Sequence, residues 1–213
     1  MTTFRHSSQK NYAGISAVLV WAALLLQLYL ILENRIAAVP ETVIRYFSYF
    51  TVLTNILVAL SFTSIYLKGI SDKGPFFSSP RNLTAIVIYI SIVGITYNAI
   101  LRFQWAPVGM NRVADELLHL VVPIVYIIFW VKFVPKKYMQ WKFILPWAIY
   151  PLVYFGYTIL RGPSAQWYPY PFMNVSELGY AKVFFNSAMV TLLFVVLAAI
   201  YIGIAKKMAS KAV

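Results

Sequence analysis

Apolar side chains fill six stretches of the chain, and polar residues gather in the short segments between them. The apolar stretches cover residues 12–32, 44–67, 83–101, 117–134, 143–160 and 183–205. A membrane-spanning helix needs about 20 mostly apolar residues, and a helix satisfies its own backbone hydrogen bonds in hydrocarbon. The pattern therefore predicts an all-α polytopic membrane protein, a six-helix bundle that forms one integral membrane domain over residues 1–213.

The composition agrees with a chain that is solvated by lipid. Of the 213 residues, 61% are hydrophobic and 11% are charged, and the mean hydropathy is +0.73. Soluble domains carry about 25% charged residues, which is more than twice this content. The chain has no cysteine and only two histidines. We therefore expect no metal site and no cofactor.

The basic residues divide unequally between the two ends of such a bundle. The end with both termini would hold 12 Lys and Arg, from Arg5 to Lys211, and one acid, Asp72; the opposite end would hold 6 Lys and Arg and five acids. Loops rich in Lys and Arg stay in the cytoplasm, so both termini are expected there. The net charge of +12 then reflects membrane insertion. Contact between the cytoplasmic loops and anionic lipid is a secondary expectation, and nucleic-acid binding is not expected.

With this orientation, polar side chains concentrate in the outer half of the bundle. They are Thr51, Asn55, Asn98, Asp115, Glu116, His119, Arg161 and Asn186. At a rise of about 1.5 Å per residue, Thr51 and Thr54 would lie roughly 10 to 15 Å below the outer end of the second span. Polar groups at such depth are costly and are often functional. Asn98 and Asn186 could also serve only as hydrogen-bonding contacts between helices.

The spacing of the acids around His119 suggests acid–base chemistry. Asp115 lies four residues before His119 and Glu116 lies three, so either carboxylate could hold the imidazole in one tautomer. Thr51 on the second span is expected at a similar depth. A hydroxyl, an imidazole and a carboxylate are the parts of a nucleophile, a general base and an orienting acid. An interfacial histidine without a catalytic role is the competing interpretation.

An aromatic segment with interleaved prolines follows the fifth span. It runs over residues 161–172 and includes Arg161, Trp167 and Tyr168. One interpretation is a belt of aromatic side chains at the membrane interface. The other is a lid over the polar cluster, because Pro169 and Pro171 stiffen the segment. The sequence leaves both interpretations open.

Several of these segments resemble a family of six-span bacterial membrane proteins. The segments are residues 47–55 (FSYFTVLTN), 115–123 (DELLHLVVP), 150–154 (YPLVY), 161–162 (RG) and 167–172 (WYPYPF), and the resemblance extends over about residues 12–205. That family is distantly similar to the eukaryotic androgen-induced membrane proteins, which are threonine hydrolases that cleave fatty acid esters of hydroxy fatty acids. The resemblance implies Thr51 as nucleophile, His119 as base and a bacterial cytoplasmic membrane as location. Thr54 remains a rival nucleophile.

These patterns and the resemblance together imply a hydrolase of long-chain fatty acid esters. Thr51 would attack the ester, His119 would accept its proton, and Asp115 would orient the imidazole. The expected substrate-binding residues are Asn55, Asn98, Glu116, Arg161, Trp167, Tyr168 and Asn186, with Asn55 or Asn98 donating to the oxyanion. The alternative is a small transporter, channel or lipid-binding protein without catalysis. A third possibility is a membrane adaptor that acts through its basic loops. The sequence gives neither the exact substrate nor the oligomeric state.

Overall fold

The computed structural model describes residues 2–104 and 106–210, with side chains from residue 7 onward. Lys211 and the side chain of Arg5 therefore lie outside the described part. The long helices are α1 (Thr2–Glu33), α3 (Phe50–Lys68), α4 (Pro80–Ala99), α7 (Ile144–Ala165) and α8 (Val175–Ser210). The remaining span consists of α5 (Gly109–Glu116), the π-helical turn η3 (Leu117–Val121) and α6 (Val122–Phe133). In the described residues, six helical segments are long and apolar enough to cross a membrane, which confirms the predicted all-α multi-pass fold.

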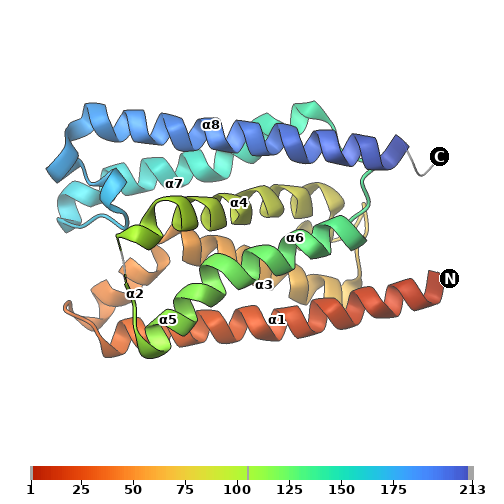
Figure 1. Ribbon diagram of the computed structural model, residues 1–213, viewed down its shortest axis with the longest axis horizontal. Coiled ribbons are helices and arrows are strands. Elements are labelled where there is room, and N and C mark those ends of the chain that lie inside the picture. The colour runs from red at the N-terminus through yellow and green to blue at the C-terminus, as the bar shows by residue number, and fades with distance from the viewer. Residues whose placement is uncertain (1, 105, 211–213) are drawn as a thin grey trace.

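The spans run side by side, and both ends of the chain lie at the same end of the bundle (Figure 1). The turns after α3 and α6 lie at this end too, with η1 (Phe76–Ser78) and η4 (Trp141–Phe143). The opposite end, called the far end below, consists of residues 34–49, 100–104, 106–108 and 166–174. It includes α2 (Val39–Phe47), η2 (Leu101–Phe103) and η5 (Pro171–Met173).

The second span is shorter than the predicted stretch over residues 44–67. The chain leaves α2 at Ser48, and Tyr49 has an extended backbone with φ −82° and ψ 125° before α3 begins at Phe50. Ser48 Oγ donates to the carbonyl of Ile44 at 2.7 Å, which satisfies a carbonyl at the end of α2. The expected depth of Thr51 was therefore wrong, because Thr51 lies in the first turn of α3. The apolar run continues through this turn, so hydropathy alone did not show it.

Helix α4 is the central helix of the bundle. It packs against α3, α6 and α8, and about two thirds of its apolar stretch is buried, compared with about one sixth of that of α7. Large apolar side chains such as Leu145 and Leu160 of α7 point outward, and each is about four fifths exposed. This surface suits lipid rather than water. The last span also begins earlier than predicted, at Val175, and it kinks at Gly179, whose φ of +72° favours glycine.

Candidate active site

The turn that contains His119 is a π-helical bulge. Val122 N–H donates to the carbonyl of Leu117, five residues back. In a regular α-helix, the carbonyls of Leu118 and His119 would accept hydrogen bonds from residues 122 and 123. The Val122 N–H is already used, and Pro123 has no N–H. The carbonyls of Leu118 and His119 therefore lack their regular α-helical donors and can accept hydrogen bonds from neighbouring helices.

Two asparagines on neighbouring helices supply these donors. Asn55 of α3 donates to the Leu118 carbonyl at 3.3 Å and to a carbonyl of its own helix at 2.8 Å. Asn98 of α4 donates to the His119 carbonyl at 3.1 Å and to a carbonyl of its own helix at 2.8 Å. Each amide thus uses both of its hydrogens on backbone carbonyls. The two side chains brace the bulge, and in this arrangement neither has a hydrogen left for a substrate oxyanion.

Asp115 and Tyr97 hold the imidazole of His119. Nδ1 of His119 lies 2.9 Å from the Asp115 carbonyl oxygen and 3.2 Å from Asp115 Oδ1. Tyr97 donates its hydroxyl to Asp115 Oδ2, and its ring stacks on the imidazole with centroids 3.9 Å apart. Because both neighbours of Nδ1 are oxygen acceptors, the tautomer with the proton on Nδ1 fits the site. Nε2 then carries the lone pair, and no hydrogen bond within the described residues occupies it.

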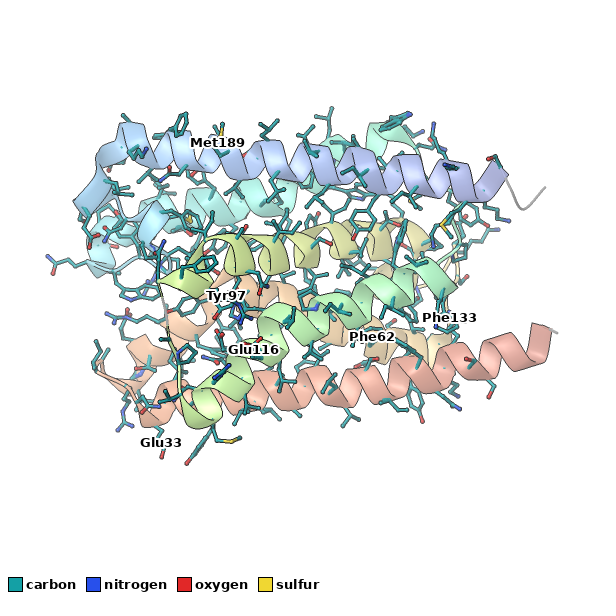
Figure 2. The ribbon with its side chains drawn as sticks, in the orientation of Figure 1. Glu33, Phe62, Tyr97, Glu116, Phe133 and Met189 are labelled. Atoms are coloured by element: carbon teal, nitrogen blue, oxygen red, sulfur yellow. The ribbon has the colours of Figure 1, made fainter. Side chains whose placement is uncertain are left out.

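Glu116, the other acid near His119 in the sequence, is engaged by Arg102. The Arg102 guanidinium donates to the two carboxylate oxygens at 2.7 and 2.6 Å, and its Nε donates to Asn98 Oδ1 at 2.9 Å. Figure 2 shows Tyr97 and Glu116 in the half of the bundle away from the chain ends. Of the two acids that the spacing left open, Asp115 is therefore the one that contacts the imidazole. Through Arg102, Glu116 links η2 to α5.

Thr51 contacts the phenol of Tyr170, a half-buried side chain of the far end. Thr51 Oγ1 lies 3.2 Å from the Tyr170 hydroxyl, and the Thr51 backbone N–H donates to the same oxygen at 3.1 Å. Burial raises the pKa of Tyr170 to about 12, so this phenol is neutral at physiological pH. The rival Thr54 is fully buried and shares a hydrogen bond of 3.0 Å with Tyr150.

Two cavities meet at Thr51. The polar cavity has a volume of about 570 Å³, and Thr51, Asp115 and His119 line it together. The apolar cavity has a volume of about 450 Å³ and lies among α3, α4, α7 and α8. Thr51, Tyr97, Leu101 and Tyr170 line both cavities, whereas Thr54 lines neither. The structure thus places the predicted nucleophile, base and acid around one space, with a second, apolar space adjoining it.

The aromatic segment after α7 forms part of the wall of the polar cavity. Trp167, Pro169, Tyr170 and Pro171 line that cavity, and the Trp167 ring packs edge-on against Tyr49 with centroids 5.6 Å apart. Tyr168, also predicted to bind substrate, is not part of either lining. Its ring fills the space beside Gly162, where an added Cβ would lie 1.9 Å from a ring carbon.

Arg161 and Asn186 hold the far end together and line neither cavity. Arg161 donates to both carboxylate oxygens of Glu41, at 2.7 and 2.9 Å. Hydrogen bonds from Arg45 and Arg161 lower the pKa of Glu41 below its ordinary value. Asn186 of α8 donates to the carbonyl of Phe172 at 3.0 Å, which fixes η5 against α8.

Two tyrosines of the site were absent from the expected residues. Tyr97 lies in an apolar span, and nothing in its spacing separates it from the other 15 tyrosines of the chain. Tyr170 lies within the WYPYPF segment, whose expected residues were Trp167 and Tyr168. Because prolines on both sides of Tyr170 fix the backbone, this segment was the available signal.

Comparisons with known proteins assign no family to the chain. No family model matches it, and neither a curated protein nor a solved structure matches it.

Proposed function

We propose that this protein is an integral membrane hydrolase of long-chain fatty acid esters, with Thr51 as nucleophile and His119 as general base. One observation supports the proposal: Thr51 and the His119–Asp115 pair line the same cavity, and Thr51 also lines an adjoining apolar cavity. A hydroxyl needs an adjacent base to become a nucleophile at neutral pH, and the base needs a group that fixes its tautomer. The described residues provide all three groups without further side chains.

In the first half of the reaction, Thr51 Oγ forms a bond to the ester carbonyl carbon, and Nε2 of His119 takes the hydroxyl proton. Asp115 stabilises the resulting imidazolium through Nδ1–H. When the tetrahedral intermediate collapses, the ester C–O bond breaks and the imidazolium gives its proton to the leaving alcohol. The acyl group remains on Thr51.

In the second half, water repeats these steps. His119 takes a proton from water as its oxygen bonds to the acyl carbon, and then returns the proton to Thr51 Oγ as the fatty acid leaves. Each half-reaction ends with the imidazole neutral. The cycle therefore needs only the ester and water.

The oxyanion is stabilised by the beginning of α3. Thr51 lies in the first turn, where backbone N–H groups have no acceptor within the helix and the helix dipole is positive. The Thr51 N–H now donates to the Tyr170 hydroxyl, which is neutral and can itself donate. These two donors replace Asn55 and Asn98, which were expected in this role. Loss of one oxyanion donor typically lowers the rate by about 10² to 10³.

Substitution of the two threonines tests the assignment. The purified protein in detergent is expected to hydrolyse a chromogenic long-chain ester. Thr51→Val and His119→Ala are expected to abolish turnover, and Thr51→Ser to retain part of it because a hydroxyl remains. Thr54→Val is the matched control, since Thr54 lies one turn away with a similar bond to a tyrosine. A fluorophosphonate is expected to label residue 51.

The outcomes separate the candidate functions. Turnover that survives both Thr51→Val and His119→Ala would exclude this mechanism. Binding of the ester without turnover would instead support the lipid-binding alternative, and flux in proteoliposomes would support transport.

The orientation of the chain is part of the proposal. The excess of Lys and Arg at the end with the termini favours a cytoplasmic location for that end in a bacterial inner membrane, with anionic lipid at its loops. The far end and the polar cavity would then face outward. Because the chain has no cysteine, Ser164→Cys in the last turn of α7, next to the far end, and Lys73→Cys at the other end each create a unique site for labelling. An impermeant maleimide added to cells is expected to modify only Ser164→Cys.

A further inference from the structure

We infer that the apolar cavity is the acyl-chain site and that the polar cavity receives the alcohol part of the ester and the water. This inference rests on the proposed hydrolase function. It states which part of the substrate lies on which side of Thr51, and it makes the apolar cavity the part of the protein that selects the acyl chain.

The lining of the apolar cavity suits a hydrocarbon chain. Among the described residues that line it, none is charged, and most are aromatic or aliphatic. The hydroxyls of Ser187 and Thr191 in its wall donate to carbonyls of their own helix, at 2.8 and 2.9 Å. They therefore present little unsatisfied polarity to a ligand. The lining of the polar cavity, by contrast, includes Arg35 and Arg45.

The position of His119 decides between the two possible orientations of the ester. His119 lines the polar cavity and not the apolar one. The leaving alcohol must take a proton from His119, and the attacking water must give one to it, so both must be on the His119 side. The acyl group stays bonded to Thr51 between these steps. Because Thr51 also lines the apolar cavity, the chain can remain there while alcohol and water exchange on the other side.

The same cavity reaches the lipid-facing surface between α7 and α8. Leu152 and Phe184 line it and are 55% and 52% exposed. The rings of Phe155 and Phe184 meet across the two helices with centroids 5.6 Å apart. An ester in the bilayer can therefore bring its chain in sideways, without passing through water. The acyl chain moves from lipid into an apolar cavity, so its transfer gains little hydrophobic free energy. The cavity therefore selects acyl chains by their shape and length.

Ala148 lines the apolar cavity at a distance from Thr51. It lies near the beginning of α7, at the end of the bundle that holds the termini, whereas Thr51 lies in the first turn of α3, next to the far end, so a larger side chain at residue 148 shortens the space for the chain. The neighbouring Ile149 is 61% exposed and does not line the cavity. Ala148→Phe and Ile149→Phe therefore form a matched pair on the same helix.

Hydrolysis of two p-nitrophenyl esters by these variants tests the inference. Ala148→Phe is expected to lower kcat/KM for the palmitoyl ester by about tenfold or more, since a misfit in an apolar pocket costs about 10- to 200-fold. The butyryl ester, which does not reach Ala148, should be hydrolysed as by the wild type. Ile149→Phe should leave both values unchanged. Equal effects of Ala148→Phe on both esters, or none on either, would overturn the assignment.

A binding arm separates this inference from the proposed function. A palmitic acid probe with a terminal diazirine is photolysed with the wild type and with the inactive Thr51→Val protein. Cross-links to α7 and α8 in both proteins, lost in Ala148→Phe and kept in Ile149→Phe, would support the acyl site even if no ester is hydrolysed. Ester hydrolysis with cross-links confined to other helices would retain the hydrolase and refute the acyl site.

Discussion

The bracing of the His119 bulge can be tested without any assumption about function. Pro123 has no N–H, and Asn98 supplies the donor that the His119 carbonyl lacks. Pro123→Ala adds a backbone N–H at this place. If that N–H points four residues back, it donates to the His119 carbonyl, and loss of the Asn98 hydrogen bond to this carbonyl then costs less. If it points five residues back, it reaches the Leu118 carbonyl and relieves Asn55 instead.

The expected magnitude follows from the hydrogen bonds that are lost. Asn98→Leu leaves the His119 carbonyl without a donor, which costs about 1 to 3 kcal/mol for a buried group. Hydrogen bonds between membrane helices average about 0.6 kcal/mol, so the lower part of that range applies. Asn98 also accepts a bond of 2.9 Å from Arg102, so the single variant mixes two losses. The Pro123→Ala background isolates the carbonyl, and we expect Asn98→Leu to cost about 0.5 to 1 kcal/mol less there.

A double-mutant cycle measures this difference. The free energy of unfolding is determined by SDS titration in mixed micelles for the wild type, Asn98→Leu, Pro123→Ala and the double variant. The same cycle with Asn55→Leu shows which carbonyl the new N–H reaches. Additivity within about 0.3 kcal/mol in both cycles would refute the reasoning, because independent sites add within about that error.

Three further predictions concern the contacts of the far end and the support of His119. Gly162→Ala places a Cβ 1.9 Å from the Tyr168 ring, and this overpacking should destabilise the protein by about 1 to 3 kcal/mol and lower the Tm. At Gly156 an added Cβ meets no atom within 4 Å, so Gly156→Ala should raise the Tm slightly through its better helix propensity. Because the pKa of Glu41 is lower in the folded protein, its ion pairs stabilise the fold above about pH 4.3, and this stabilisation is lost on acidification. E41Q should therefore make the free energy of unfolding less dependent on pH in this range. Tyr97→Phe keeps the ring that stacks on His119 and removes the hydrogen bond to Asp115, so we expect a lower kcat for ester hydrolysis.

The sequence predicted the number and type of the spans because membrane helices leave a strong signal in hydropathy. It did not predict where the second span begins. Ser48 and Tyr49 interrupt the helix, but neither is a proline or a glycine, and apolar residues follow at once. This two-residue interruption determines the environment of Thr51, because a side chain in the first turn of α3 meets the far-end loops rather than the inner bundle.

The candidate site was predicted in its residue types and only partly in their roles. Spacing placed Asp115 beside His119, but it could not distinguish Asp115 from Glu116, because Arg102 comes from a different helix. Asn55 and Asn98 were recognised as unusual residues in a membrane span. Their use as backbone braces depends on the π-bulge, and a bulge is a change of helical register that composition does not reveal.

The bulge and the interruption before α3 act together to form the site. A continuous second span would bury Thr51 within the bundle, and a regular fourth span would turn the residues before Pro123 to a different face. Each irregularity leaves backbone groups unsatisfied, and the chain satisfies them with Ser48, Asn55 and Asn98. Irregular backbone in a membrane protein is tolerated where it is buried in protein or lines a cavity, and it is costly elsewhere. Both irregularities adjoin the polar cavity, so the same features that weaken the helices place Thr51 and His119 around one space.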